Sequence, residues 1–244
     1  MKSFKGLFAV VLIVLSTALY VAQIVIFHAE RDTFFYLFQD LAFVPINVLL
    51  VTVIVDQVLR FRERLALLKK LNMVIGAFFS EVGTKLMRHF VRFDEDLSGI
   101  GSRLIVSGTW DDRTFDHAVQ AVRQHAVRID YRRGDLPALK EFLVARRGFL
   151  LGLLENQNLL EHASFTELLW AVFHLMEELD SRSEVADLPR ADGDHIAGDI
   201  KRAYLIIIAE WLLYMKYLKK EYPYLFSLAI RTNPFDPNAS VAVK

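Results

Sequence analysis

The sequence predicts an all-α protein in which an N-terminal transmembrane helical hairpin is followed by a cytoplasmic helical bundle. Apolar runs at Gly6–Phe27 and Leu41–Val55 are joined by a short polar segment. A helix of about 20 apolar residues is long enough to cross a membrane. Beyond Arg60, apolar residues recur at helical spacing, and strand-like alternation is confined to Leu104–Ser107. These observations together predict the fold class.

The first apolar run is expected to be a retained membrane span over residues 6–27. It follows the basic residues Lys2 and Lys5, as the apolar part of a signal peptide also would. It is, however, 22 residues long, whereas the apolar part of a cleavable signal has about 7–15 residues and ends at a small-residue cleavage site. We therefore expect it to remain in the protein.

The second span is expected over residues 33–59, with Pro45 inside it. Basic residues lie before the first span and after the second, where Arg60, Arg62 and Arg64 begin a basic segment. Since basic residues favour the cytoplasmic side, both termini are predicted to be cytoplasmic. The expected location is the cell inner membrane, with two spans in a domain covering residues 1–59.

A helix is predicted to continue from the second span over residues 60–92, with an apolar stripe at alternating spacings of three and four. The stripe has a second apolar row beside it, which favours packing into a bundle within one chain or between chains. We expect oligomer or bundle contacts, and hence a homo-oligomer, at Leu68, Asn72, Ile75, Gly76, Phe79, Val82 and Gly83.

Residues 93–231 are predicted to form the cytoplasmic α-helical bundle, and residues 232–244 a flexible tail. The boundaries between these helices and loops are predicted from Gly, Pro and capping residues. The expected elements are a loop at Phe93–Arg103, a helix from Thr109 to about Ile129, a helix from Leu136 to about Leu154, a capping box at Ser164–Glu167 that starts the next helix, a loop at Ser181–Gly193, a long helix from Asp194 to about Tyr222, and a short helix at Tyr224–Ile230.

Composition excludes several classes of partner. The chain has 29 basic and 29 acidic residues, so its formal net charge is zero and no nucleic-acid partner is expected. It has no cysteine, so disulfides and thiolate chemistry are excluded, which fits a domain in a reducing cytosol. The basic doublets Arg132-Arg133 and Arg146-Arg147 are interpreted as solvated or facing lipid head groups.

Histidines and carboxylates gather in the second half of the chain. The candidate metal ligands are His174 with Glu177, three residues apart, and His195 with Asp199, four residues apart. Nearby are Glu155, Glu161, His162, Glu178, Asp192 and Asp194. The alternative is that these side chains are solvated charges and helix caps, because no Glu-x-x-His motif accompanies them. The sequence assigns no cofactor.

Polar residues also lie in the second span, at Asp40, Asn47, Thr52 and Asp56. Polar groups at membrane depth are often functional, and in an oligomer this segment would line a pore. The alternative places Asp40 and Asp56 at the two interfaces and Asn47 against the first helix.

Two stretches resemble prokaryotic two-span integral membrane proteins of unassigned function that carry a helical cytoplasmic domain. They are Asp40–Thr84, particularly Lys70–Gly83, and Tyr222–Phe235. The resemblance implies the same topology and domain type, and it brings no catalytic residues.

The sequence therefore predicts a non-enzymatic membrane-anchored protein whose helical domain mediates self-association or binds a protein partner at the bilayer. No hydrolase, kinase or nucleotide-binding motif is present, and no catalytic residue is assigned. An oligomeric ion channel and a metal-dependent helical-bundle enzyme are the alternatives.

Overall fold

The computed structural model describes residues 2–27, 30–96, 98–157, 159 and 162–242. The protein is all-α, as predicted, and its only described β-pairing is an isolated bridge between Asp94 and Ile129. The chain forms two compact units, Met1–Leu65 and Ala66–Lys244.

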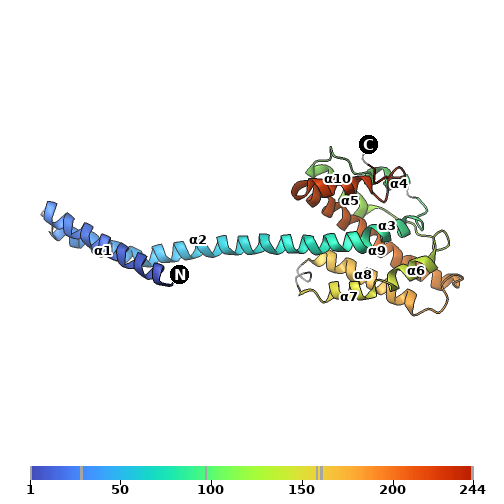
Figure 1. Ribbon diagram of the computed structural model, residues 1–244, viewed down its shortest axis with the longest axis horizontal. Coiled ribbons are helices and arrows are strands. Elements are labelled where there is room, and N and C mark those ends of the chain that lie inside the picture. Colours follow the sequence, from blue (N-terminus) through green and yellow to red (C-terminus); the bar gives the residue numbers. More distant parts are fainter. Residues whose placement is uncertain (1, 28–29, 97, 158, 160–161, 243–244) are drawn as a thin grey trace. The chain divides into compact units, whose positions relative to one another are not determined.

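The first unit consists of α1 (Lys2–Phe27) and the first part of α2 (Glu30–Phe78). The two helices lie side by side (Figure 1), and the Tyr20 hydroxyl donates a hydrogen bond of 3.0 Å to Oδ2 of Asp40. Apolar side chains from Val10 to Leu59 are largely exposed, with Phe38 at 75%. Water is a poor environment for so much exposed apolar surface.

Among the described residues, one helix is long and apolar enough to cross a membrane, the 61-residue stretch Arg31–Val91 near the N-terminus. Val10–Ile26 is a shorter apolar helix. Length and composition are the only basis for this finding, so the two-span arrangement stays a prediction.

The helix predicted over residues 60–92 is continuous to Val91, but it contains a π-helical turn that the sequence did not reveal. The turn is η1 (Phe79–Gly83), and α3 (Thr84–Val91) follows it without a break. Thr84 Oγ1 donates to the carbonyl oxygen of Phe79, five residues earlier, at 2.9 Å. π-helical turns are uncommon and are frequently found near functional sites.

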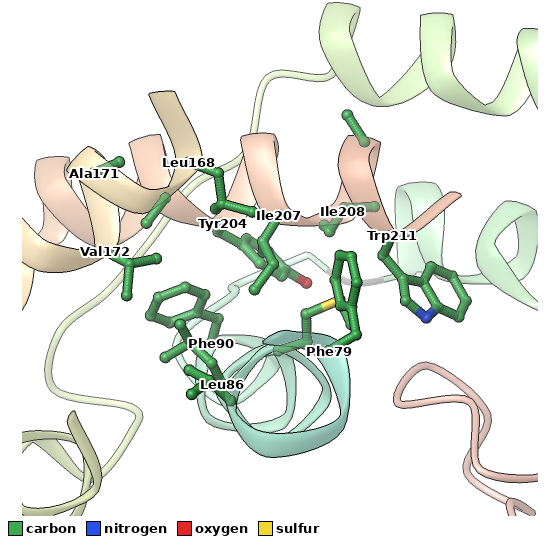
Figure 2. Close-up of a cluster of buried hydrophobic side chains, with 14 of the residues drawn as sticks. Phe79, Leu86, Phe90, Leu168, Ala171, Val172, Tyr204, Ile207, Ile208 and Trp211 are labelled. Atoms are coloured by element: carbon green, nitrogen blue, oxygen red, sulfur yellow. The ribbon is translucent and has the colours of Figure 1, made fainter. Parts of the chain in front are cut away.

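The core of the second unit lies around α9 (Arg190–Glu221), which contacts α3, α5, α8 and α10. Figure 2 shows Phe79 and Phe90 packing toward Tyr204 and Ile207 of α9, with Val172 of α8 beside them. All five side chains are at most 3% exposed. This burial holds the helices of the second unit together.

The remaining elements match the predicted pattern, with shifted boundaries. They are α4 (Ser98–Gly101), η2 (Ser102–Leu104), α5 (Asp112–Gln124), α6 (Leu136–Val144), α7 (Arg147–Leu154), α8 (Ala163–Asp180) and α10 (Pro223–Arg231). The expected loop at 93–103 thus contains two short helical turns.

One predicted helix ends early and another is interrupted. The helix expected to reach Ile129 ends at Gln124, because the next residues pair with an extended segment: Glu95 N donates to the Arg128 carbonyl at 3.0 Å. The helix expected over Leu136–Leu154 is broken at Ala145 and Arg146 into α6 and α7.

The starts of α8 and α9 also differ from the sequence prediction. The cap of α8 is His162, whose Nδ1 accepts from Phe165 N at 3.3 Å, so the expected capping box at Ser164 lies inside the helix. The long helix starts at Arg190, after Pro189, and not at Asp194. Proline at this position suits a helix start since its φ is fixed in the helical range.

The predicted flexible tail begins with an anchored segment. Asn233 is 1% exposed and its Nδ2 donates to the Leu104 carbonyl at 2.8 Å. Phe235 is also buried, against Trp211. A flexible tail therefore does not describe residues 233–235.

Candidate metal centre

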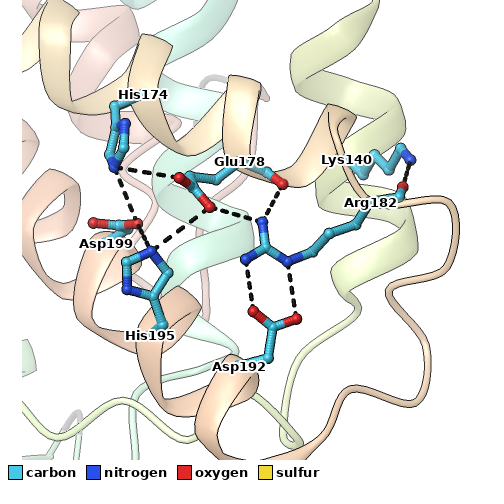
Figure 3. Close-up of polar contacts among 7 residues, drawn as sticks. All are labelled: Lys140, His174, Glu178, Arg182, Asp192, His195 and Asp199. Atoms are coloured by element: carbon cyan, nitrogen blue, oxygen red, sulfur yellow. Dashed lines mark hydrogen bonds and ion pairs between the residues drawn. The ribbon is translucent and has the colours of Figure 1, made fainter.

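Four potential metal ligands face one another between α8 and α9. His174 and Glu178 lie one helical turn apart on α8, and His195 and Asp199 lie one turn apart on α9. Because residues four apart share a helical face, each helix presents one imidazole and one carboxylate. Figure 3 shows the four side chains converging from the two helices.

Ligand atoms of His174, Glu178 and His195 all lie within 4.8 Å of one another, a spacing that could hold one metal ion. Asp199 Oδ2 lies 3.4 Å from His174 Nε2 and 3.5 Å from His195 Nε2. Glu178 lies 3.6 Å from His195 Nε2 through Oε2 and 4.0 Å from His174 Nε2 through Oε1. Four ligands at about 2.0–2.1 Å from a tetrahedral ion are about 3.3–3.4 Å from one another. Asp199 lies beside both imidazoles and is the candidate fourth ligand.

Asp199 is the residue of this cluster whose burial favours a bound cation. Its side chain is 4% exposed, and Oδ2 has no hydrogen-bond partner although it points between the two imidazoles. A buried carboxylate oxygen without a partner is costly. A bound cation would satisfy it.

Arginines hold the two carboxylates in place. Arg182 donates to Glu178 Oε2 at 2.8 Å and makes two bonds to Asp192, at 3.0 and 2.6 Å. The hydrogen bond from Arg182 lowers the pKa of Glu178, and it does the same for Asp192. Arg202 lies 3.5 Å from Asp199 Oδ1, leaving Oδ2 for the centre. Such outer contacts orient metal ligands.

Three of the four sequence-predicted ligands meet here, and Glu177 does not. It forms an ion pair with Arg147 of α7, which also lies 3.7 Å from Asp180. Glu178 takes the place assigned to Glu177, because at 100° per residue a position four residues on is closer to the face of His174 than one three residues on. The matching spacings of four on both helices were the signal that could have identified Glu178.

The other members of the predicted cluster have separate roles. His162 caps α8, Asp192 binds Arg182, and Asp194 pairs with Arg190 at 3.8 Å. Glu155 is an exposed residue at the end of α7. Glu161 lies outside the described residues.

The predicted contact stripe divides into a buried and an open part. Ile75, Phe79 and Val82 are at most 3% exposed within the chain's own core, so they make bundle contacts. Gly83 is buried in the π turn, and Gly76 faces Tyr214, whose hydroxyl would lie 2.8 Å from an added Cβ. Asn72 Nδ2 donates to the Leu68 carbonyl at 3.0 Å, and Leu68 is 42% exposed.

The polar residues of the second apolar segment also divide. Asp40 accepts from Tyr20, and Asp56 accepts from Arg60 Nε at 2.9 Å. Asn47 and Thr52 are exposed. In the part of the chain that the structure describes, a hydrogen bond from Tyr20 to Asp40 joins α1 to α2.

The structure therefore defines an all-α protein that has an N-terminal helical unit and, in its C-terminal unit, a cluster of histidines and carboxylates. The chain belongs to the MJ1433 family: the model of the MJ1433 N-terminal helical domain matches residues 1–59, and that of the C-terminal helical domain of uncharacterized protein MJ1433 matches residues 67–231. No solved structure matches the chain significantly.

The curated relative is uncharacterized protein MJ1433 of Methanocaldococcus jannaschii. It is 42% identical over 243 residues, which cover 100% of this chain and 97% of the relative. Both helical domains therefore occur together in the two proteins.

Proposed function

We propose that this is a membrane-anchored protein whose helical domain binds one divalent transition-metal ion. The ligands are His174, Glu178, His195 and Asp199. The observation that carries the proposal is the buried Asp199 oxygen, which has no hydrogen-bond partner and lies 3.4 and 3.5 Å from two imidazole nitrogens.

The donor set indicates which ions would bind. Two imidazole nitrogens and two carboxylate oxygens suit Zn²⁺, and also Mn²⁺, Fe²⁺ or Co²⁺, better than Ca²⁺ or Mg²⁺, which prefer oxygen alone. The sequence by itself assigned no cofactor.

The ion would be reachable from solvent. The side chains of His174 and His195 are 46% and 53% exposed, in contrast to Asp199 beneath them. Such a site allows metal exchange and the approach of an external ligand. Metal binding is therefore the primary activity we assign, and a reaction at the ion would require that external ligand.

The test is the metal content of full-length protein, purified in detergent, dialysed against Zn²⁺ and then against metal-free buffer. We expect one Zn²⁺ per chain by elemental mass spectrometry. His195→Ala and Asp199→Ala should lose it, and circular dichroism checks that both variants are folded.

Glu177→Ala is the matched control for Glu178→Ala, since the two residues are neighbours on α8 and only Glu178 faces the centre. Loss of Zn²⁺ with Glu178→Ala and retention with Glu177→Ala supports the site. Equal metal content in all the variants would refute it.

Membrane anchoring is supported by the exposed apolar surface of α1 and the first part of α2 and by the length of the apolar helix Arg31–Val91. The basic residues that flank the segments favour two spans with both termini in the cytoplasm. This proposal places the metal centre on the cytoplasmic side of the inner membrane.

The absence of cysteine makes the topology directly testable. Asp32→Cys in the first turn of α2, between the two predicted spans, and Ser240→Cys near the C-terminus each introduce a single thiol. A membrane-impermeant maleimide applied to intact cells should label the first and not the second. Labelling of both or neither would contradict the two-span arrangement.

Self-association remains a second candidate, favoured by the open part of the stripe. Phe61, Leu65 and Leu68 are 64%, 44% and 42% exposed and follow spacings of four and three, as in a helix that pairs with a second copy. Leu68→Cys should form a disulfide-linked dimer on mild oxidation, and Glu63→Cys on another face should not. A monomeric Leu68→Cys protein would count against self-association here.

A further inference from the structure

A hollow in the second unit is lined mostly by basic side chains. It has a volume of about 250 Å³ and is formed where α3 faces the junction of α6 and α7. Its lining residues are Lys85, Arg88, His89, Arg92, Phe142 and Arg146. No carboxylate is among them. We call it the basic pocket.

The cations of the basic pocket make no ion pair with a carboxylate of the described residues. Lys85, Arg88, Arg92 and Arg146 have no described carboxylate within ion-pair distance, although Arg147, Arg182 and Arg202 each have at least one. Arg88 and Arg146 donate to backbone carbonyls instead, those of Thr232 and Glu81. Cations three and four residues apart on a helix repel one another, so this arrangement favours an anion.

An apolar groove adjoins the basic pocket and shares Lys85 and Arg88 with it. The groove has a volume of about 330 Å³ and runs between the π turn, α9 and α10. Its apolar lining includes Phe79, Trp211, Met215, Leu218, Leu225 and Leu228. A further hollow of about 480 Å³ shares Gly76, Ser80 and Leu225 with it, which extends the apolar surface.

We infer that the basic pocket and the groove together bind one anionic lipid, with its phosphate headgroup among the basic side chains and an apolar chain along the groove. Arginine suits a phosphate because its planar fork makes paired hydrogen bonds to two oxygens. Arg146 also stacks on Phe142 at 4.2 Å, which fixes its guanidinium at the pocket. A purely polar anion would leave the groove unused.

The ligand is a lipid of the bilayer. This choice of source rests on the proposed membrane anchoring, whereas the affinity of the pocket for an anionic amphiphile is independent of anchoring. The experiment therefore supplies a soluble amphiphile, which reaches the pocket whether or not the chain is anchored.

The experiment is equilibrium dialysis of octyl phosphate and of inorganic phosphate against the full-length protein in phosphatidylcholine nanodiscs, with EDTA present and empty discs as the blank. Each methylene that enters an apolar site improves binding by about fourfold. We expect octyl phosphate to bind at least about tenfold more tightly than inorganic phosphate, as only a few methylenes need be buried.

Two variants separate the headgroup from the chain. Arg92→Gln should weaken both ligands by about tenfold, because a charge-assisted bond is lost. Leu228→Gln, at a residue 41% exposed, should weaken octyl phosphate alone. Arg123→Gln on α5 and Leu151→Gln on α7, which line neither hollow, are the matched controls.

Equal affinity for the two ligands would overturn the lipid and leave a simple anion site. Unchanged binding in Arg92→Gln would overturn the basic pocket itself. Nanodiscs that contain phosphatidic acid should compete with octyl phosphate. If they do not compete while octyl phosphate still binds to the pocket, the bilayer source and its basis in anchoring fail, and a soluble amphiphile is the ligand.

Discussion

The candidate metal centre and the basic pocket are both clusters of charged side chains in the second unit, but they differ in whether those charges are paired within the chain. Between α8 and α9, arginines and imidazoles lie within ion-pair distance of Glu178 and Asp199, and the buried Asp199 Oδ2 has no hydrogen bond. Beside α3, the cations have no carboxylate partners among the described residues and no anion is supplied by the fold. We propose that the first arrangement binds a cation and the second an anion.

The difference also shows that the net charge of a chain does not predict the local charge of its surfaces. A chain with 29 basic and 29 acidic residues gives no field that predicts an anionic partner. Folding segregates these charges, because side chains far apart in sequence meet at one surface. Binding preferences therefore follow from local pairing, and the predictions below test that pairing at each site.

The largest effect is expected from filling the metal centre. A ligand that binds only the folded state at 100 times its dissociation constant stabilises it by about 2.7 kcal/mol. Zn²⁺ at that excess should raise the free energy of unfolding of the wild type by this amount, measured by chemical denaturation in detergent. His195→Ala should show no gain; an equal gain in His195→Ala would place the ion elsewhere.

Next in size is the loss of the arginine that orients Glu178. Removing such an outer contact typically costs 10- to 100-fold in metal affinity. Arg182→Gln should therefore bind Zn²⁺ about 10- to 100-fold more weakly in a competition titration with a coloured chelator. Arg147→Gln, which loses the pair with Glu177, is the control, and equal weakening in both would show a general effect of charge.

A smaller effect is expected from protonation in the basic pocket. Burial lowers the pKa of His89 below its usual 6.5, and Arg92 and Arg146 add to this while Asp135 opposes it. Lys85 and Arg88 also line the pocket. Since the unfolded chain binds this proton more readily, stability is full above pH 6.5 and falls as the pH drops toward the folded-state pKa.

The measurement is the thermal midpoint of the wild type and of His89→Gln between pH 5 and 7.5. The wild type should lose more stability on acidification than the variant. Saturating octyl phosphate should reduce this loss, because a bound anion favours the imidazolium. A variant that is as acid-sensitive as the wild type would contradict the assignment to His89.

The smallest effect is expected at an exposed ion pair next to the metal centre. Arg190 and Asp194 pair at 3.8 Å with side chains 87% and 65% exposed. Exposed pairs contribute about 0–1 kcal/mol. Arg190→Gln should change neither Zn²⁺ affinity nor unfolding measurably; a large loss of Zn²⁺ would mean that the centre depends on this pair.

The sequence predicted the all-α class and most helices because apolar spacing and capping are local signals. The boundaries that failed depend on tertiary contacts, such as the pairing of residues 93–95 with 128–130 that ends α5. The π turn had no recognisable signal, since its residues read as ordinary helix.

The candidate metal site was partly predictable for the same reason. The spacing of four between His195 and Asp199, repeated by His174 and Glu178, was available in the sequence, whereas the packing of α8 against α9 that brings the two pairs together was not. The sequence predicts the same role, solvated or facing lipid head groups, for both residues of the doublet Arg146-Arg147. In the structure, Arg146 lines the basic pocket and Arg147 pairs with Glu177. Neighbours in sequence point to different surfaces of a helix, so the doublet could not be assigned without the fold.

The most direct test of the account is the visible absorption spectrum of Co²⁺ added to the metal-free full-length protein. Four-coordinate Co²⁺ absorbs far more strongly in the visible range than the hydrated ion. We predict an intense band that saturates at one Co²⁺ per chain, persists in Glu177→Ala, and is absent from Asp199→Ala and His195→Ala. A spectrum that stays that of hydrated Co²⁺ would contradict the metal centre.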